Sequence, residues 1–354
     1  MKTLYLFIYL PLISIAFTNC VSKQSKPIPI DLDRAAGAIP YSAFVDEIEY
    51  RELNTRDSCI LSEIEKIYID NDTLLIQDKL NGGILTFDRK GKLISQINYF
   101  GEGPEEFITI TAFCIDPEKN IIYIWDYPSQ KIKKYTYQGD FIGADKSEFF
   151  VRDFTVLKDG NRLCVFPCYS EYLPSGIWIS DKKDQIVKDF QVDVPQGEKI
   201  EFAGTNYNID HDSIFIYDRN HDYLYCLVND SLQVKYAFKP KQVLEKELRK
   251  KDPSNYQPLL KEIAYMSNFS LSNQYLLQTY KYLNNPDDPY RFVLYDRKNG
   301  RTHIGKDLLN DIDNVPSTDP HVYYLDKNTW CRVVETDVNN CDILLQLLRI
   351  KRSK

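Results

Sequence analysis

The sequence has no hydrophobic run long enough to cross a bilayer. Its N-terminal run, Leu4–Phe17, spans about 14 uncharged and mostly apolar residues, whereas a membrane-spanning helix needs roughly 20. A run of this length close behind Lys2 is typical of the apolar part of a secretory signal. We therefore expect residues 1–19 to be a signal peptide that is removed from the mature protein.

The sequence also lacks the excess of basic residues that a nucleic-acid partner requires. It has 44 Lys and Arg residues against 51 Asp and Glu residues, which gives a net charge of −7. Removal of residues 1–19 would take away Lys2 and no acidic residue, so the net charge would fall by one, to −8. Because phosphate backbones are bound by clustered cations, we expect no nucleic-acid partner.

Motifs that carry catalysis or bind metals are missing as well. The chain has no GxSxG, HExxH, CxxC or EF-hand pattern, and the spacing of Cys164 and Cys168 suits neither a redox pair nor zinc. Its four histidines, of which no two lie at i and i+4, are His211, His221, His303 and His321. We expect no catalytic residue, no metal and no cofactor, and we interpret the seven cysteines after Cys20 as buried thiols.

Two segments resemble ligand-binding loops without completing them. Gly300–Lys306 has the GxxxxGK part of a phosphate-binding loop, but Asp307 replaces the Ser or Thr that would bind magnesium. Asp311 and Asp313 are the kind of carboxylates that could hold calcium, with a polar loop as the alternative. We interpret the first segment as a hairpin and the second as a polar loop.

A cysteine just behind the N-terminal apolar run indicates a lipid anchor. Bacterial lipoprotein signals place such a cysteine at the new N-terminus, and this run ends in Phe-Thr-Asn-Cys20. Asn19 departs from the small residue that usually precedes the cysteine, so ordinary signal cleavage is the alternative. We expect Cys20 to be lipidated, and we expect residues 20–41, which are polar and contain proline, to be a tether.

What the chain has in abundance is short strand-like runs that recur. Leu74–Asp78, Ile122–Asp126 and Ile214–Asp218 each end in Asp, and each is followed by a second strand-like run and a turn. The first two of these Asp residues lie 48 positions apart. A period of about 40–50 residues with about four strands in each repeat is typical of a propeller blade. We therefore expect residues 42–350 to form an all-β, six-bladed β-propeller, in which the recurring Asp residues cap turns.

Residues 101–107, GEGPEEF, form the most marked turn of the sequence. Gly101 and Gly103 can adopt positive φ, Pro104 fixes the next φ, and Phe107 is suited to fill the space beneath the loop. The three glutamates of the segment would repel a phosphate group. We therefore interpret these four residues as a structural turn and not as an anion-binding loop.

One further segment interrupts the series of repeats, and another precedes it. Residues 239–266 are charged and rich in helix-forming residues, and Pro253 and Pro258 divide the segment into two short helical stretches. We therefore expect a small helical insertion. The strand-like run Ile48–Leu53 precedes the first full repeat. We expect it to join the last blade and so to close the ring, which leaves no free sheet edge.

With its start, its repeats and its GEGPEEF turn, the chain resembles the six-bladed β-propeller lipoproteins of Bacteroides-type gut bacteria. The resemblance covers about residues 42–350 and is firmest over Ile67–Phe141, which also resembles NHL repeats. It implies a propeller in the cell envelope, held at the outer membrane by its lipid, and it brings no catalytic residues with it. Because Val21–Ser25 contains no acidic residue, the periplasmic face is favoured.

Two functions are compatible with these features. The favoured hypothesis is a non-catalytic binding or scaffolding module, anchored to the membrane through Cys20, that holds a peptide, a glycan or an envelope protein. The alternative is an NHL-like propeller enzyme, a lyase or hydrolase, with a site at the channel mouth, because the fold alone does not decide between the two.

Overall fold

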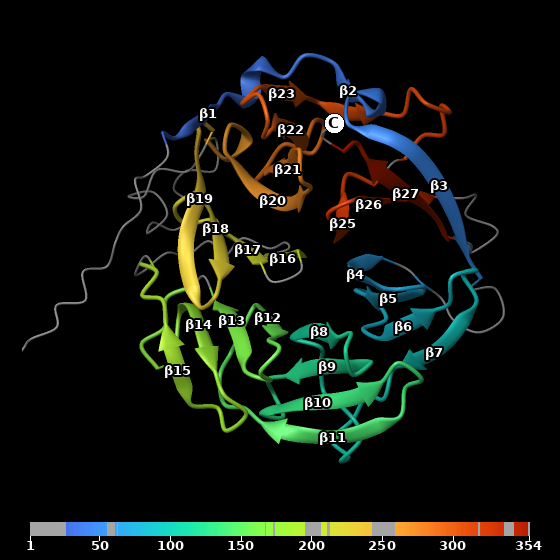
Figure 1. Cartoon of the computed structure of the whole chain (residues 1–354), viewed down its shortest axis with the longest axis vertical. Coiled ribbons are helices and arrows are strands. Elements are labelled where there is room, and N and C mark those ends of the chain that lie inside the picture. The colour runs from blue at the N-terminus through green and yellow to red at the C-terminus, as the bar shows by residue number, and fades with distance from the viewer. Residues whose placement is uncertain are drawn as a thin grey trace, which may run out of the picture.

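The computed structural model describes residues 26–54, 61, 63–166, 168–172, 174–194, 207–210, 213–242, 259–317, 319–335 and 343–352. Over these residues the regular elements are β-strands and short 3₁₀ turns, which include η1 (Leu32–Arg34) and η2 (Tyr41–Ala43). Six antiparallel units of four strands stand around a common axis (Figure 1). The chain is thus all-β, and the predicted six-bladed β-propeller is confirmed.

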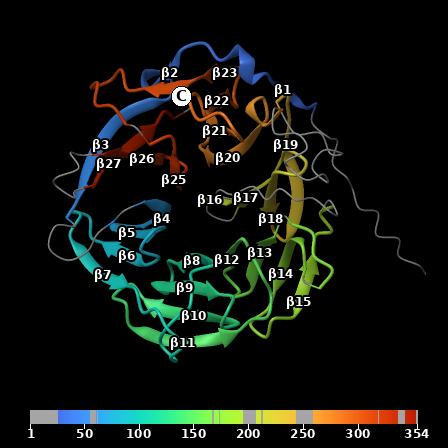
Figure 2. The ribbon, with the colours of Figure 1, turned by 180° about the vertical axis from the view of Figure 1, so that it is seen from behind.

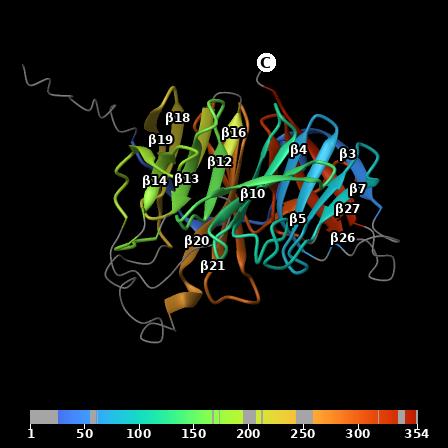
Figure 3. The ribbon, with the colours of Figure 1, turned by 90° about the horizontal axis from the view of Figure 1, so that it is seen from below.

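The blades follow one another along the chain. The first three consist of β4 (Ile64–Asp70), β5 (Thr73–Asp78), β6 (Ile84–Phe87) and β7 (Leu93–Ile97); β8 (Ala112–Asp116), β9 (Ile121–Asp126), β10 (Lys131–Thr136) and β11 (Phe141–Lys146); and β12 (Asp153–Val156), β13 (Arg162–Phe166), β14 (Gly176–Ser180) and β15 (Ile186–Asp189). The other three consist of β16 (Tyr207–Asp210), β17 (Ser213–Asp218), β18 (Tyr223–Val228) and β19 (Ser231–Pro240); β20 (Ala264–Leu271), β21 (Tyr275–Tyr282), β22 (Tyr290–Asp296) and β23 (Thr302–Gly305); and β25 (Tyr323–Asp326), β26 (Thr329–Glu335), β27 (Ile343–Ile350) and β3 (Val45–Leu53). The first strand of each blade lies next to the axis, and Figure 3 shows the ring from its side.

The hydrophobic core consists of the layers between neighbouring blades. All five residues of β8 are buried, whereas β11, at the outside of the same blade, alternates between half-buried and exposed residues. Inner strands therefore have both faces covered, while outer strands keep the alternation of a half-solvated sheet. The layer between the first two blades includes Leu75, Ile97, Phe113, Ile124 and Tyr135.

An N-terminal strand closes the ring. β3 pairs antiparallel with β27, from Leu53 opposite Ile343 to Val45 opposite Ile350. The last blade therefore takes three strands from the C-terminal part of the chain and its outer strand from the N-terminal part. The expectation that Ile48–Leu53 joins the last blade is confirmed.

The end of the expected tether belongs to the folded body. β1 (Ile28–Ile30) pairs in parallel with β19, and β2 (Ala38–Pro40) pairs in parallel with β24 (Asp307–Leu309). We call residues 28–41 the strap, because they run along the outside of the fourth and fifth blades (Figures 1 and 2). The expected boundary at residue 42 is therefore corrected, since paired backbone begins at Ile28. Residues 1–25, which include the expected signal peptide and Cys20, lie outside the described residues.

The predicted helical insertion is not shown by the structure. β19 continues to Pro240 and β20 begins at Ala264, so both ends of the predicted segment, residues 239–266, are strands. Between them residues 259–261 form a 3₁₀ turn, and residues 243–258 lie outside the described residues. Helix propensity was misleading at the ends because pairing with β1, at Lys239 and Pro240, and with β21, at Ala264–Met266, decides the backbone there.

Gly91 provides a test of how closely the closing strand packs on the first blade. Its φ is +76°, and a Cβ atom would lie 1.8 Å from the backbone oxygen of Glu52 in β3. We predict that Gly91→Ala lowers the free energy of unfolding by about 3 kcal/mol, because the clash also breaks the hydrogen bond from the Asn54 N–H to the Gly91 oxygen (2.8 Å). Gly37→Ala is the matched control. Gly37 also has positive φ, +61°, but no described atom lies within 4 Å of its Cβ position, so only about 1 kcal/mol of backbone strain is expected. Equal urea-unfolding midpoints for the two variants would contradict the prediction.

Candidate functional site

A pocket of about 440 Å³ opens at one mouth of the central channel, and we call it the mouth pocket. It is lined by five of the six inner strands, β4, β8, β12, β16 and β25, or by the turns directly after them. Its aliphatic walls include Ile67, Ile115, Val156, Leu157 and Leu325. Because the blade repeat brings the end of each inner strand to the same face, one pocket collects side chains from five distant segments of the chain.

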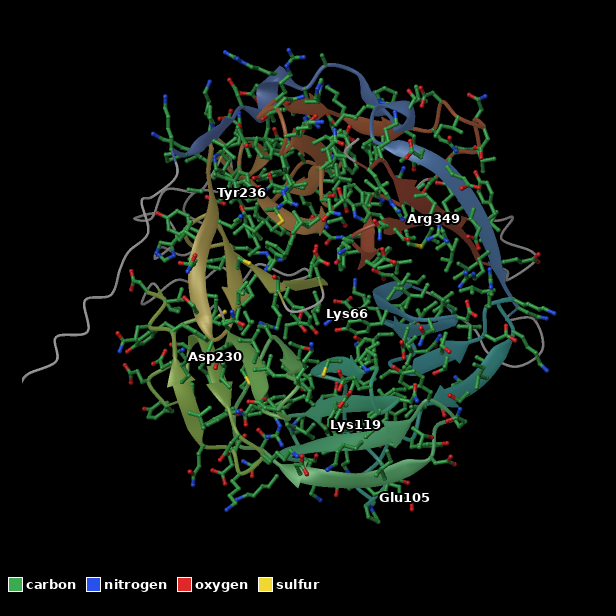
Figure 4. The ribbon with its side chains drawn as sticks, viewed as in Figure 1. Lys66, Glu105, Lys119, Asp230, Tyr236 and Arg349 are labelled. Carbon is green, nitrogen blue, oxygen red and sulfur yellow. The ribbon has the colours of Figure 1, made fainter. Side chains whose placement is uncertain are left out.

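A second pocket, of about 340 Å³, includes the starting residues of inner strands in the first three blades, so it faces the opposite mouth. Its lining includes Glu65, Lys66, Arg152 and Asp153. Lys66 belongs to the linings of both pockets, and Figure 4 shows it near the centre of the ring. Lys66 and the side chains that contact it therefore separate the two pockets. We call Lys66, Tyr68, Asp153 and Tyr207 the channel plug.

The centre of the channel plug is an ion pair. The Nζ atom of Lys66 lies 2.7 Å from the Asp153 carboxylate, and the two side chains are 15% and 7% exposed. The same ammonium group donates to the backbone oxygen of Phe113 (3.3 Å) and lies 4.6 Å from the ring centroid of Tyr207. A carboxylate, a carbonyl and an aromatic face thus replace the water that a buried ammonium group loses.

Two tyrosines complete the channel plug. The hydroxyl of Tyr207 donates to the backbone oxygen of Phe154 (2.7 Å), and it lies 2.5 Å from the hydroxyl of Tyr68. Tyr68 also contacts the oxygen of Phe113 (3.3 Å). The four blades that contribute these residues are thereby joined at the axis by side chains and not by backbone pairing.

Burial and neighbouring charges shift the pKa values of Lys66, Tyr68 and Tyr207 in the channel plug. Burial by itself would lower the pKa of Lys66, but the Asp153 carboxylate and Tyr68 more than offset this effect and raise the pKa above that of a free lysine. Burial raises the pKa of Tyr68 and of Tyr207. The contribution of the raised Lys66 pKa to stability is complete below the pKa of unfolded lysine, about 10.4. It is lost as the pH rises through the higher folded value.

The other tyrosines of the mouth pocket cap strand edges. Tyr323 donates its hydroxyl to the backbone oxygen of Ile64 (2.9 Å), and Tyr324 donates to that of Ile209 (2.6 Å). An inner strand has no paired neighbour on its channel side, so its carbonyl groups need such donors. These hydroxyls are therefore engaged by the fold, and the rings remain as walls.

Asn208 lines the mouth pocket, and one of its side-chain polar atoms lacks a hydrogen-bond partner among the described residues. The residue is 2% exposed, and its Nδ2 atom donates to the backbone oxygen of Tyr207 (2.9 Å). Among the described residues, its Oδ1 atom has no hydrogen-bond partner. A buried amide oxygen without a partner carries a desolvation cost that a donor from a ligand would remove.

The charges around the mouth pocket are of both signs. Lys119 lies 2.6 Å from the Asp116 carboxylate, and Lys327 lies 3.2 Å from that of Asp210. The lining also includes Glu118 and Lys158. Balanced charges of this kind do not create the strong potential that draws a polyanion or a polycation to a cleft.

The residues of the GEGPEEF turn lie away from the axis, as the position of Glu105 in Figure 4 illustrates. Gly101 has φ +156°, and its N–H donates to the backbone oxygen of Phe107 (3.1 Å). The N–H of Gly103 donates to the Glu106 carboxylate (2.9 Å), and Lys133 donates to the backbone oxygen of Pro104 (3.0 Å). Phe107 is fully buried in the layer between the first two blades. These contacts are those of a folded turn.

The remaining candidates from the sequence lie apart from the channel or outside the described residues. Asp311 accepts hydrogen bonds from Ser42, and Asp313 accepts one from Tyr50, so both help to attach the N-terminal segment. Residues 300–306 contribute the turn and strand of the hairpin β22–β23. Cys20 and His211 belong to the residues that the structure does not describe.

The other three histidines show no shared site. The Nδ1 atom of His221 lies 2.6 Å from Asp218, that of His321 lies 2.8 Å from Asp319, and His303 is part of β23. Within the described residues no group of three or more His, Cys, Asp or Glu side chains is placed to hold a metal ion. No helix in that part of the chain is long and apolar enough to span a membrane.

The sequence reasoning missed the residues that the structure brings to the axis. Lys66 is the clearest case, because a lone lysine between Ile64, Ile67 and Ile69 departs from the apolar pattern of its strand. This departure was the available signal. Its partners Asp153 and Tyr207 are 87 and 141 residues away in sequence, and nothing local relates them to Lys66.

A family model covers most of the chain. Residues 27–340 match the model described as "Domain of unknown function (DUF4934)". The chain belongs to this family. No curated protein matches the sequence, and the family description names no activity.

Solved structures share the fold of this DUF4934 protein. A candidate exported protein from Bacteroides fragilis superposes with a TM-score of 0.74 at 19% identity, over 92% of this chain and 100% of that chain. A member of the DUF4221 family from Bacteroides vulgatus superposes with a TM-score of 0.60 at 9% identity, over 88% of this chain and 98% of that chain. At these identities the likeness shows a common six-bladed fold.

Proposed function

We propose that this protein is a non-catalytic binding module whose site is the mouth pocket. Its ligand would be a peptide, a glycan or a segment of an envelope protein. The observation that carries the proposal is the mouth pocket itself, a concave hollow of about 440 Å³ with aliphatic walls and a few convergent polar groups. Small-ligand sites have this size and composition. Its floor is the channel plug, so a ligand would rest against Tyr68 and Tyr207.

The protonation states of the channel plug support binding over catalysis. A general acid or base works best when its pKa lies near the working pH. The pKa values of Lys66, Tyr68 and Tyr207 are all raised, away from neutrality, and the hydroxyl of Tyr207 is engaged by backbone. These groups would therefore hold their protons while a ligand is bound.

We further propose that the protein resides in the bacterial cell envelope, held at the outer membrane by a lipid on Cys20 and facing the periplasm. Support comes from the apolar run that precedes Cys20 and from the absence of acidic residues in Val21–Ser25. The B. fragilis structure, a candidate exported protein, agrees with this location. We also propose that the blades within Ile67–Phe141 are NHL-like repeats.

Cys20→Ala tests the anchor. We expect the variant to move from the membrane fraction to the soluble fraction, and from the detergent phase to the aqueous phase of a Triton X-114 separation. Ser22→Ala, two residues away, is the matched control and should stay with the membrane. Unchanged partitioning of Cys20→Ala would contradict lipidation.

Crosslinking in intact cells tests the binding site. Lys158 lines the mouth pocket and is exposed, so a photo-crosslinking residue in its place should capture the bound species. The same residue in place of Ile142, which is 50% exposed on outer strand β11, is the control. We expect a discrete adduct at position 158 that is absent at position 142. Equal adducts at both positions would contradict the proposed site, and a captured species that is cleaved or eliminated would favour a lyase or hydrolase.

A further inference from the structure

We infer that the mouth pocket takes an apolar side chain of an extended peptide, and that Asn208 accepts a hydrogen bond from the adjoining peptide backbone. The inference rests on the proposed binding function and selects one class of ligand within it. It is carried by three independent features: the lining, the uncommitted oxygen of Asn208, and the charge balance of the rim.

The lining matches an aliphatic or aromatic side chain better than a sugar. Ile67, Ile115, Val156, Leu157 and Leu325 supply the walls, and these groups offer no hydrogen bonds to hydroxyls. A sugar ring carries a hydroxyl on almost every carbon, and burial of those hydroxyls against aliphatic walls would leave them without partners. An apolar side chain gains free energy from the same burial.

The tyrosines do not change this preference. The hydroxyls of Tyr207, Tyr323 and Tyr324 donate to backbone oxygens of inner strands, so they are not available as donors to a sugar. The rings of Tyr68 and Tyr207 flank the Lys66 ammonium group at 5.0 and 4.6 Å from their centroids. Part of their aromatic surface is therefore used by the channel plug and not by a stacked ligand.

Asn208 supplies the polar contact that a peptide backbone requires. Its Oδ1 atom is an acceptor without a partner among the described residues, in a side chain that is 2% exposed and that lines the mouth pocket. The missing partner is a donor, and every peptide residue other than proline carries a backbone N–H group close to its side chain. A ligand that inserts its apolar side chain thus carries a donor next to it.

The rim favours an uncharged segment. Within each of the ion pairs Asp116–Lys119 and Asp210–Lys327 the two charges neutralise one another. Asp116 and Lys119 line the mouth pocket, and Asp210 directly follows the lining residue Ile209. Glu118 and Lys158 add one charge of each sign. A phosphate, a sulfated glycan or a strongly acidic peptide would meet as many repelling as attracting groups.

The test uses two small probes with the folded protein. N-acetyl-leucine-N-methylamide carries one apolar side chain and two backbone N–H groups, and N-acetylglucosamine carries hydroxyls and one acetamide. We expect saturation-transfer NMR to detect the leucine probe with a Kd on the order of 1 mM. We expect N-acetylglucosamine to give no transfer at the same concentration.

Three variants test whether the leucine probe binds in the mouth pocket. Asn208→Leu removes the acceptor at similar volume and should weaken binding about tenfold. Ile209→Asp puts a charge on a lining residue that is 36% exposed, and it should abolish saturation transfer. Ile142→Asp, the same change at an exposed isoleucine of an outer strand, should leave Kd within about twofold. The melting temperature of each variant checks that it is folded.

The possible outcomes distinguish an error in the proposed ligand class from an error in the proposed binding function. Binding of the leucine probe that depends on Asn208 and Ile209 supports the inference. Binding of N-acetylglucosamine that depends on the same residues would overturn the peptide class and leave the mouth pocket as a binding site. Failure of both probes, or equal binding by all variants, would overturn the inference, and the crosslink at position 158 would then decide on the proposed function by itself.

Discussion

Lys66→Met is expected to lower the free energy of unfolding by about 3–5 kcal/mol. The substitution removes the ammonium group from the channel plug and leaves the Asp153 carboxylate, 7% exposed, without its ion-pair partner. The backbone oxygen of Phe113 loses a donor as well. The cost is therefore that of an uncompensated buried charge, which is far larger than the net worth of a solvent-exposed pair.

Urea unfolding of three more variants isolates this cause. Lys79→Met is the matched control in the same blade, because Lys79 pairs with Glu63 at 2.6 Å while both side chains are about half exposed. Such a pair is worth about 0–1 kcal/mol. Asp153→Asn alone should also be costly, and the double variant Lys66→Met with Asp153→Asn should recover part of the loss. A cost for Lys66→Met no larger than that for Lys79→Met would show that the channel plug does not stabilise the ring.

Deletion of residues 42–55 is expected to abolish the cooperative unfolding transition. The deletion removes β3, which closes the ring by pairing with β27, and it removes the buried side chains of Phe44, Val45 and Leu53. At about 1.5–3 kcal/mol each, these three side chains contribute roughly 5–9 kcal/mol. The whole stability of a domain is about 5–15 kcal/mol. Loss of the closing strand also exposes the edge of β27 to other chains.

Truncation before Gly37 is the graded comparison. It removes β1 and η1 with buried Leu32, but it keeps β2, η2 and the closing strand β3. We expect this variant to unfold cooperatively at a lower temperature. Calorimetry gives the transition, and fluorescence of Trp330, which is fully buried 5.8 Å from the ring of Phe44, reports on the closure. A full calorimetric transition in the protein without residues 42–55 would refute the role of β3.

The prediction of the fold from sequence succeeded where local patterns repeat. The strand that ends in Asp126, the GEGPEEF turn with Phe107 and the closing run Ile48–Leu53 were all visible in the alternation of apolar and polar residues and in the spacing of turn residues. The strap was missed because β1 and β2 are three residues each, and Pro27, Pro29 and Pro40 indicate a tether by composition. Edge pairing with β19 and β24 decides their conformation.

The candidate site could not be predicted in the same way. Its polar residues do not repeat from blade to blade: Lys66 comes from β4, Asp153 from β12, and Tyr207 and Asn208 from β16. Each of them reads locally as an irregularity in an apolar strand. Only their partners explain them, and those partners belong to other blades.

The sequence by itself determined the repeating strands and the number of blades, because alternation and turn chemistry act over a few residues and recur with each blade. Ring closure then decided which side chains meet at the channel axis. It brought Lys66 and Asp153 into a buried ion pair, engaged the tyrosine hydroxyls with strand edges, and left the Oδ1 atom of Asn208, a residue that lines the mouth pocket, without a partner among the described residues. The physical reason is that a propeller buries its repeats against one another, whereas its channel is lined by side chains whose neighbours are set by blade position and not by sequence distance.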